Sequence, residues 1–187
     1  MQEVFIQDQT FDKNDLWTKG EYENCIFNHC NLTETDLSAF KFIDCTFNMC
    51  NFSLAKLHKT TFQNVKFVDC KMLGIRFDTC NELGLSFSFE NCLLNHSSFY
   101  KMKIKKTTFK NSQLQEVDFA EADLTNSLFD NCDLIRATFD HSILEKVDFR
   151  TSYNYSIDPT TTRIKKAKFS IAGISGLLDQ YDIDIEK

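Results

Sequence analysis

The sequence is poor in residues that break regular structure and in motifs that carry common chemistry. It has one proline, Pro159, and five glycines scattered along its 187 residues. Scattered glycines exclude a glycine-rich phosphate-binding loop. No apolar stretch approaches the roughly 20 residues that cross a membrane. No basic region followed by an apolar run comes after Met1, so we expect no signal peptide and a cytoplasmic protein.

Metal-binding motifs are also missing. The eight cysteines include no Cys-x-x-Cys pair, and the four histidines include no His-x-x-x-His pair. The histidines are scattered at positions that we expect to face solvent: His29, His58, His96 and His141. The sequence therefore predicts no metal site and no cofactor.

The dominant feature that is present is a large apolar residue at every fifth position. Neither an α-helix, with a period of 3.6, nor a strand, with a period of two, produces this spacing. A chain that turns a corner after every five residues does. The large residues of the first run are Tyr22, Phe27, Leu32, Leu37, Phe42, Phe47, Phe52, Leu57, Phe62, Phe67, Met72 and Phe77. Those of the second run are Phe89, Leu94, Phe99, Ile104, Phe109, Leu114, Phe119, Leu124, Phe129, Leu134, Phe139, Leu144 and Phe149.

A small or compact residue lies two positions before most of these large residues. One large and one small inward residue per short side describe a narrow solenoid. A free cysteine at the small position acts as a small buried hydrophobe, and parallel inward side chains rarely meet disulfide geometry. We therefore expect buried free thiols at the cysteines that share this phase, which are Cys25, Cys30, Cys45, Cys50, Cys70, Cys80, Cys92 and Cys132.

Residues twenty positions apart share a type, which predicts four five-residue sides per coil. Such residues would stack directly above one another, about 4.7–4.9 Å apart, as in parallel strands. One column of the second run comprises Phe89, Phe109, Phe129 and Phe149. A second column comprises Phe99, Phe119 and Phe139.

Single units follow a consensus of a small residue, Asp or Asn, Leu or Phe, and two variable residues. Examples are Ala122-Asp123-Leu124-Thr125-Asn126 and Cys132-Asp133-Leu134-Ile135-Arg136. In these units the chain resembles the pentapeptide-repeat family, from roughly Gly20 to Phe149. The resemblance implies an all-β fold, a right-handed quadrilateral parallel β-helix.

The register divides the chain into five parts. Residues 1–19 are out of register and are predicted to form an N-terminal cap, with a strand at Val4-Phe5-Ile6 and with Phe11, Leu16 and Trp17 plugging the first coil. Residues 20–79 and 89–169 are predicted as two β-helix segments, with Phe169 continuing the column of Phe149. Residues 80–88 form a register break that carries two extra residues and a kink near Gly84. This break is either a joint between the segments or a loop that contacts a partner.

Residues 170–187 are predicted to form a C-terminal helix and strand. Ser170 is suited to cap a short α-helix, and Ile183-Asp184-Ile185 is typical of a strand. The helix is expected to cover the last coil, and its remaining apolar surface predicts a homodimer through this end, with a monomeric cap as the alternative. The predicted dimerisation residues are Ile171, Ile174, Leu177, Leu178, Tyr181, Ile183 and Ile185.

The formal net charge of −6 is unevenly placed. Between Ser112 and Phe149 nine acids face only two bases, whereas Asn91 to Gln115 contains five lysines (Lys101, Lys103, Lys105, Lys106 and Lys110) and no acid. An acidic rod repels nucleic acid and suits a protein surface that normally receives phosphate groups; a solvated face kept acidic for solubility is the alternative. The predicted partner-binding acids, all at outward positions, are Glu116, Asp118, Glu121, Asp123, Asp130, Asp133, Asp140, Glu145 and Asp148.

Within the family, the order of the parts looks like that of the Qnr-type topoisomerase-protecting and immunity proteins. Those proteins dimerise through the C-terminus and present a DNA-like acidic rod to DNA gyrase or topoisomerase IV. The resemblance implies a chain that binds such an enzyme and relieves poisoning by a quinolone or a peptide toxin, without binding nucleic acid or membrane. The quinolone-protecting members carry long projecting loops, whereas the interruption here adds two residues.

Two other functions are compatible with a solenoid. One is a general interaction scaffold with an unrelated protein partner. The other is an enzyme, since some long-coil β-helices cleave polysaccharides with clustered acids. Five-residue sides leave little groove, and no pair of carboxylates stands out from the general acidic surface. The sequence therefore predicts a protein that is not an enzyme.

Overall fold

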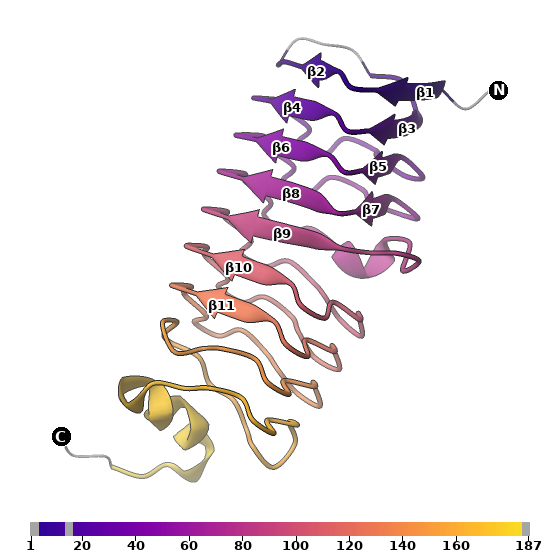
Figure 1. Ribbon diagram of the computed structural model, residues 1–187. Coiled ribbons are helices and arrows are strands. Elements are labelled where there is room, and N and C mark those ends of the chain that lie inside the picture. Colours follow the sequence, from indigo (N-terminus) through magenta and orange to yellow (C-terminus); the bar gives the residue numbers. More distant parts are fainter. Residues whose placement is uncertain (1–3, 14–16, 185–187) are drawn as a thin grey trace.

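The protein is a parallel β-solenoid, seen in a computed structural model that describes residues 4–13 and 17–184 (Figure 1). The strands are β1 (Val4–Gln7), β2 (Thr10–Phe11), β3 (Gly20–Glu23), β4 (Ile26–Asn28), β5 (Lys41–Ile43), β6 (Thr46–Asn48), β7 (Thr61–Gln63), β8 (Val65–Val68), β9 (Phe87–Glu90), β10 (Thr108–Lys110) and β11 (Leu128–Asp130). Three short 3₁₀-helices are η1 (Phe77–Thr79), η2 (Ile171–Leu177) and η3 (Asp179–Tyr181). Within the described ranges, no helix has the length and apolar character needed to cross a bilayer.

Each coil has four sides, which we number in chain order. Side 1 is a seven-stranded parallel sheet of order β11-β10-β9-β8-β6-β4-β2. Sides 2 and 3 are joined by isolated parallel bridges, such as Asn31–Asn51 and Asp36–Lys56. Side 4 begins as the sheet β1-β3-β5-β7 and continues below the register break in bridges between Lys103, Asp123, Ile143 and Arg163. The partners are twenty residues apart in nearly every pairing, as the columns of the sequence predict.

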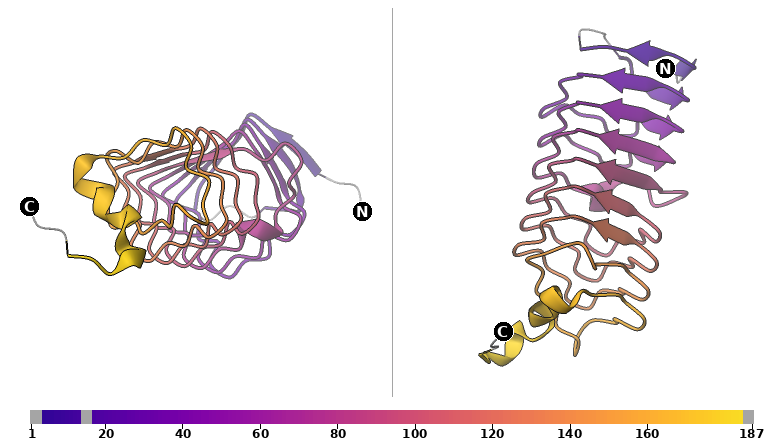
Figure 2. Two further views of the ribbon diagram at one scale, coloured as in Figure 1. Left: turned by 90° about the horizontal axis from the view of Figure 1, so that it is seen from below. Right: turned by 60° about the vertical axis from the view of Figure 1, so that its left-hand side comes forward.

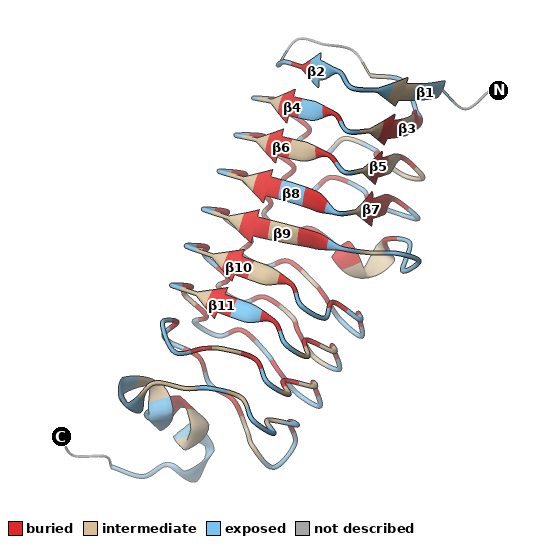
Figure 3. Cartoon of the chain, in the orientation of Figure 1, coloured by how far each residue is buried: buried red, intermediate tan, exposed pale blue. Residues whose placement is uncertain are grey.

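The core is a set of stacked aromatic columns, and buried positions alternate with outward ones along each side (Figure 3). On side 1 the ring centroids of Phe109 lie 5.2 Å from Phe89 and 4.8 Å from Phe129, with the planes within 9° of parallel. Phe149 and Phe169 stack in the same way at 5.5 Å, so the predicted last rung of this column is confirmed. Offset-stacked rings contribute beyond the area they bury. Stacking of identical residues therefore makes the core continuous along the rod.

The corners between sides are formed by residues in the left-handed backbone conformation. Examples are His29 (φ 56°), Leu54 (φ 59°) and Lys101 (φ 61°). This conformation is unfavourable for most L-residues. The amide of each of these corners is nevertheless paired with the neighbouring coil, as when Lys101 N–H donates to the carbonyl of Ala120 at 3.0 Å. Hydrogen bonding between coils therefore maintains the square cross-section without glycine at most corners.

The register break inserts two residues on one coil. Phe87 of β9 pairs with Val65 of β8, twenty-two residues away, and the spacing returns to twenty between β9 and β10. The extra length lies in a turn that exposes Leu83 and contains Gly84 at φ 71°. A side chain at Gly84 would also collide with Gln63. Because Phe67 and Phe89 still stack at 5.3 Å across the break, the coils on both sides share one core.

The first coil is shorter than the others. β1 and β2 pair with β3 and β4 at a spacing of sixteen residues, so the predicted strand at Val4 to Ile6 is confirmed. Phe11 stacks on Phe27 at 4.9 Å, and the Trp17 ring lies 4.5 Å from the same residue. Both therefore plug the first coil as predicted. Leu16 lies outside the described residues.

The C-terminal segment differs from the prediction in two respects. Its helix is of the 3₁₀ type rather than α, and Ile183 and Asp184 belong to no strand; Ile185 lies outside the described residues. Gly173 and Gly176 press against Tyr155, where an added Cβ would meet the phenol oxygen or the backbone at about 2 Å. Glycine also disfavours an α-helix. The predicted N-cap of this helix, Ser170, is confirmed, because the Gly173 N–H donates to Ser170 Oγ at 3.1 Å.

The helix η2 lies beside the last coil and covers part of that end of the rod (Figure 2). Its backbone is joined to the solenoid where Ile157 N–H donates to the Gly176 carbonyl at 2.8 Å. The apolar residues Ile171, Ile174 and Leu177 are three apart, a spacing that fits a 3₁₀-helix as well as an α-helix. The period alone therefore could not separate the two helix types.

Candidate partner-binding surface

The nine predicted partner-binding acids lie at outward positions on the last coils, and none is buried. They do not share one side. The bridge partners place Asp148 on side 1, Asp133 on side 2, Asp118 on side 3 and Asp123 on side 4. The chain order then places Asp130 on side 1, Glu116 at the corner of sides 2 and 3, Asp140 on side 3, Glu121 at the corner of sides 3 and 4, and Glu145 on side 4. The structure thus distributes the acids around the rod, because successive acids fall on successive sides of each coil.

Five of the nine acids form ion pairs with bases, mostly of neighbouring coils. The distances are 2.5 Å for Glu116–Arg136, 3.4 Å for Glu121–Lys101, 3.0 Å for Asp123–Lys105, 2.6 Å for Glu145–Arg163 and 2.8 Å for Asp148–Arg150. Exposed pairs of this kind contribute about 0–1 kcal/mol to stability. They nevertheless cancel much of the negative potential that these five carboxylates would otherwise produce.

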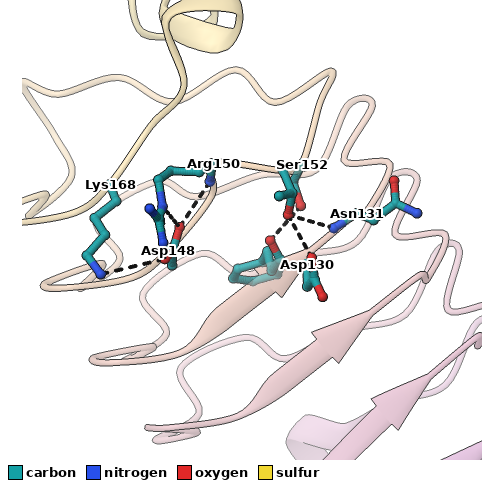
Figure 4. Close-up of polar contacts among 8 residues, drawn as sticks. Asp130, Asn131, Asp148, Arg150, Ser152 and Lys168 are labelled. Atoms are coloured by element: carbon teal, nitrogen blue, oxygen red, sulfur yellow. Dashed lines mark hydrogen bonds and ion pairs between the residues drawn. The ribbon is translucent and has the colours of Figure 1, made fainter.

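Asp148 and Glu121 show how the pairing affects ionisation. The Arg150 guanidinium donates two hydrogen bonds to the Asp148 carboxylate, and this lowers the pKa of Asp148 (Figure 4). Lys168 lies 3.7 Å from the same carboxylate. The Tyr100 hydroxyl donates to Glu121 at 2.9 Å and lowers the pKa of that group. Both acids are therefore charged at neutral pH, and both already interact with side chains of their own chain.

The other four acids, Asp118, Asp130, Asp133 and Asp140, have no ion pair within the described part of the chain. Asp118 accepts from the Ala120 amide at 2.9 Å, and Asp133 accepts from Asn154 Nδ2 at 2.8 Å. Asp130 accepts from the Thr151 hydroxyl at 2.9 Å; it lies beside Asn131 in Figure 4. Neutral donors orient Asp118, Asp130 and Asp133 without removing their charge. With Asp140, these acids form the uncompensated part of the acidic surface.

The ion pairs between neighbouring coils were not predicted from the sequence, although the sequence contains a signal for them in the spacing of opposite charges. Glu121 lies twenty residues after Lys101, Arg136 lies twenty after Glu116, and Lys110 lies twenty after Glu90, to which it is bonded at 2.7 Å. The spacing that predicts stacked phenylalanines also predicts opposite charges on adjacent coils. Two lysines of the basic stretch, Lys101 and Lys105, are thereby partners of the predicted acids.

Comparison with protein families agrees with the coil geometry. The family model described as the pentapeptide repeat region matches residues 21–88 and 85–155, most of the chain. The chain belongs to the pentapeptide-repeat family. None of the curated proteins matches it.

Several solved pentapeptide-repeat structures are similar to this chain. A trypsin-treated variant of QnrB1, described as a plasmid-mediated fluoroquinolone resistance protein, is 20% identical, with 98% of each chain covered and a TM-score of 0.45. Full-length QnrB1 is 21% identical over 97% of this chain and 98% of that one, with a TM-score of 0.40. HetL, involved in heterocyst differentiation regulation in Nostoc sp. strain PCC 7120, is 16% identical, covering 89% and 85%, with a TM-score of 0.34.

The predicted dimerisation residues of this pentapeptide-repeat chain divide into two groups. Leu177 packs against the core, and Leu178 is half-buried. The exposed group consists of Ile171 (91%), Ile174 (50%), Tyr181 (54%) and Ile183 (54%). Ile185 lies outside the described residues.

Two apolar residues that the sequence did not single out lie at the same end of the rod. Ile135 and Tyr153 are partly exposed and line a cavity of about 450 Å³ together with Gly173 and Ser175 of η2. Ile135 is the fourth residue of its repeat on side 2, and Tyr153 is an outward residue of another repeat on the same side. Both kinds of position are usually polar in this chain. The sequence signal for this apolar surface is an apolar residue at an outward repeat position near a terminus. The exposed apolar area at this end therefore extends from the helix onto the last coils.

All eight cysteines are buried and none is bridged by a disulfide, as predicted. Most of their sulfurs lie near backbone carbonyl oxygens; Cys132 Sγ, for example, lies 3.4 Å from the Phe109 carbonyl oxygen. Burial raises the pKa of Cys45 to about 12 and that of Cys132 to about 11. These thiols stay protonated at neutral pH, so they serve as packing groups.

No described group of three or more His, Cys, Asp or Glu side chains has the arrangement of a metal site. The histidines are exposed, and two of them approach acids: His29 lies 3.5 Å from Asp12 and His96 lies 3.2 Å from Glu116.

Proposed function

We propose that this pentapeptide-repeat chain is a non-enzymatic, DNA-mimicking protein that binds DNA gyrase or topoisomerase IV and gives protection or immunity against their poisons. The observation that carries the proposal is a narrow rod whose last coils present outward carboxylates, of which Asp118, Asp130, Asp133 and Asp140 have no described ion pair. A DNA-binding channel attracts such a surface through its positive potential. The resemblance of the sequence to Qnr-type proteins supports the choice of enzyme.

Binding to the topoisomerase has more support than protection against quinolones. The interruption of the repeats near Gly84 adds only two residues and forms a small turn. Quinolone-protecting family members carry long projecting loops. A quinolone and a peptide toxin that acts on the same enzyme therefore both belong in the test.

The test is a gyrase supercoiling assay with and without a quinolone or a peptide poison. We expect micromolar protein to restore supercoiling in at least one poisoned reaction. The variant Asp118→Asn/Asp130→Asn/Asp133→Asn/Asp140→Asn should lose roughly tenfold or more in apparent affinity, because four uncompensated charges are removed. The amide side chains keep the acceptor oxygen and so preserve the local hydrogen bonds.

A matched control removes four acids from the first coils: Glu34→Gln/Asp36→Asn/Asp44→Asn/Asp69→Asn. It changes the net charge equally and should behave as the unmodified protein. Absence of rescue, inhibition and binding at micromolar protein would eliminate the proposal. Equal losses in both variants would show that only the overall charge matters.

A general interaction scaffold is the second candidate. It is favoured by the five ion pairs, which leave a surface of mixed charge rather than a uniformly acidic one. A pull-down from the source cell that recovers a partner other than a topoisomerase, and loses it with the fourfold Asp variant, would support this candidate.

We also propose that two copies associate through the C-terminal end. Ile171 and Ile174 are exposed on the outer surface of η2, and Tyr153 extends the apolar area onto the last coil. Burying such area against a second copy is favourable by about 25 cal/mol per Å². Isolated exposed apolar residues are common, but here several gather at one end.

We expect the unmodified protein to sediment as a dimer and the variant Ile171→Glu/Ile174→Glu to sediment as a monomer. Charges in an apolar interface are costly to desolvate. Sedimentation equilibrium measures the change, and Ile26→Glu, on an exposed residue of β4 at the other end, is the control. A monomeric unmodified protein, or a dimer that survives the double substitution, would contradict this proposal.

A further inference from the structure

One corner of the solenoid carries a row of lysines in the coils that follow the register break. At the corner where side 4 meets side 1, Lys106, Asn126, Lys146 and Lys166 occupy equivalent positions, all exposed and with φ between 60° and 62°. Backbone hydrogen bonds of 3.0 Å run from Lys106 to Thr125, from Asn126 to Glu145 and from Lys146 to Lys165. These bonds place the corner residues of successive coils directly above one another. The side chains therefore project from a straight, convex edge.

Two further lysines widen this edge. Lys165 precedes Lys166 on side 4, and Lys103 begins the side 4 bridge column that continues through Asp123. We call the following set the basic ridge: Lys103, Lys106, Lys146, Lys165 and Lys166. All five are exposed, and within the described ranges none of them takes part in an ion pair.

The carboxylates closest in the fold are already occupied by other bases. Asp123 is paired with Lys105 at 3.0 Å, Glu145 with Arg163 at 2.6 Å, and Asp148 with Arg150 at 2.8 Å. The amino groups of the basic ridge are thus left without a counter-charge from their own chain.

The local charge is opposite in sign to that of the whole protein. Around this corner eight bases face three acids, a net charge of +5 in a chain whose formal charge is −6. The bases are Lys103, Lys105, Lys106, Lys146, Arg163, Lys165, Lys166 and Lys168, and the acids are Asp123, Glu145 and Asp148. Of the four uncompensated acids, Asp118, Asp133 and Asp140 lie on sides 2 and 3, and Asp130 lies on side 1. In the coils that follow the register break, positive charge therefore gathers at the corner of sides 4 and 1, and most of the uncompensated negative charge lies on sides 2 and 3.

We propose that the basic ridge binds an extended acidic segment of a partner protein, lying along the rod axis. Successive coils are about 4.8 Å apart, so Lys146 and Lys166 are separated by one such step and Lys106 and Lys146 by two. Acidic side chains on one face of an extended chain repeat every ~6.8 Å, within reach of flexible lysines. The Asn126 amide, between two lysines, can donate to a carbonyl of the bound segment.

A single extended chain fits this edge better than a nucleic acid duplex does. The ridge is convex, so a duplex would extend over sides 1 and 4 and approach Glu145 and Asp148. The negative charge of the whole protein also opposes the approach of a long polyanion. The proposal is independent of the proposed topoisomerase binding, whose test substitutes Asp118, Asp130, Asp133 and Asp140, because none of these acids pairs with a lysine of the basic ridge in the part of the chain that the structure describes.

The test is fluorescence anisotropy with a labelled twelve-residue peptide of alternating Glu and Gly at low salt. We expect saturable binding that weakens as salt rises. The variant Lys106→Gln/Lys146→Gln/Lys166→Gln should weaken binding about tenfold, as the loss of three exposed charge pairs implies. Circular dichroism checks that the variants are folded, and the exposed positions make unfolding a minor concern.

The matched control is Lys56→Gln/Lys59→Gln/Lys71→Gln, which makes the same charge change before the register break. These lysines lie on side 3, at the corner of sides 3 and 4, and on side 2. It should bind the peptide within twofold of the unmodified protein. The proposal is overturned if the peptide does not bind, if both triple variants weaken binding equally, or if a 20-base-pair DNA duplex binds the ridge more tightly than the peptide.

Discussion

The variant Phe109→Ala is expected to lose about 3–5 kcal/mol of the free energy of unfolding, the range found when a buried phenylalanine is truncated. Phe109 is fully buried, stacks on Phe89 and Phe129, and meets Phe99 and Phe119 edge-on at 5.8 Å. Removing its ring leaves a cavity in the centre of the rod and interrupts the side 1 column. Stability in a solenoid depends on contacts between neighbouring coils, so both adjacent coils are affected.

Thermal or denaturant unfolding measures this loss, with two variants for comparison. Thr108→Ala changes an outward residue of the same strand, β10, and should cost less than about 0.5 kcal/mol. Phe169→Ala removes the last ring of the column, which is half-buried, stacks on Phe149 and meets Tyr155 at a tilt. Its effect should be smaller than that of Phe109→Ala, because less of the ring is buried. If Phe109→Ala and Thr108→Ala unfold alike, the aromatic column is not what stabilises the coils.

The second large effect is a loss of stability at alkaline pH that originates in the buried thiols. Burial raises the pKa of Cys45 to about 12 and that of Cys132 to about 11, from an ordinary cysteine value of 9.0. The folded protein therefore holds these protons to higher pH than the unfolded chain does. The stabilisation is fully present below pH 9 and is lost as the pH rises toward 11 to 12. At pH 10 the loss is about 1.4 kcal/mol per thiol, or about 3 kcal/mol for the two.

The variant Cys45→Ala/Cys132→Ala separates the thiols from other groups that titrate in this range. Alanine occupies the equivalent position at Ala122 and Ala137, so the fold accepts it. Urea unfolding at pH 7 and pH 10 should show that the variant loses about 3 kcal/mol less than the unmodified protein between these values. Equal losses in the two proteins would mean that the thiols ionise as readily in the folded chain as in the unfolded one.

The sequence alone predicted the architecture and the core, for a reason of geometry. A large residue every fifth position and a small one two before it define each side locally, and repetition at twenty residues aligns the coils. Phe109 could thus be assigned to a column with Phe89 and Phe129 without any long-range information. The burial of cysteines such as Cys132 followed from the same phase.

Other features depended on how distant residues meet, and only the folded chain decided them. The acids Asp118, Asp123 and Asp133 are close in sequence but lie on different sides, because each five-residue step turns the chain by a corner. The helix type at the C-terminus was set by the packing of Gly173 and Gly176 on Tyr155, since the spacing of the apolar residues allowed either helix. The basic ridge exists because Lys106, Lys146 and Lys166, far apart along the chain, share one corner while other bases occupy the nearby carboxylates.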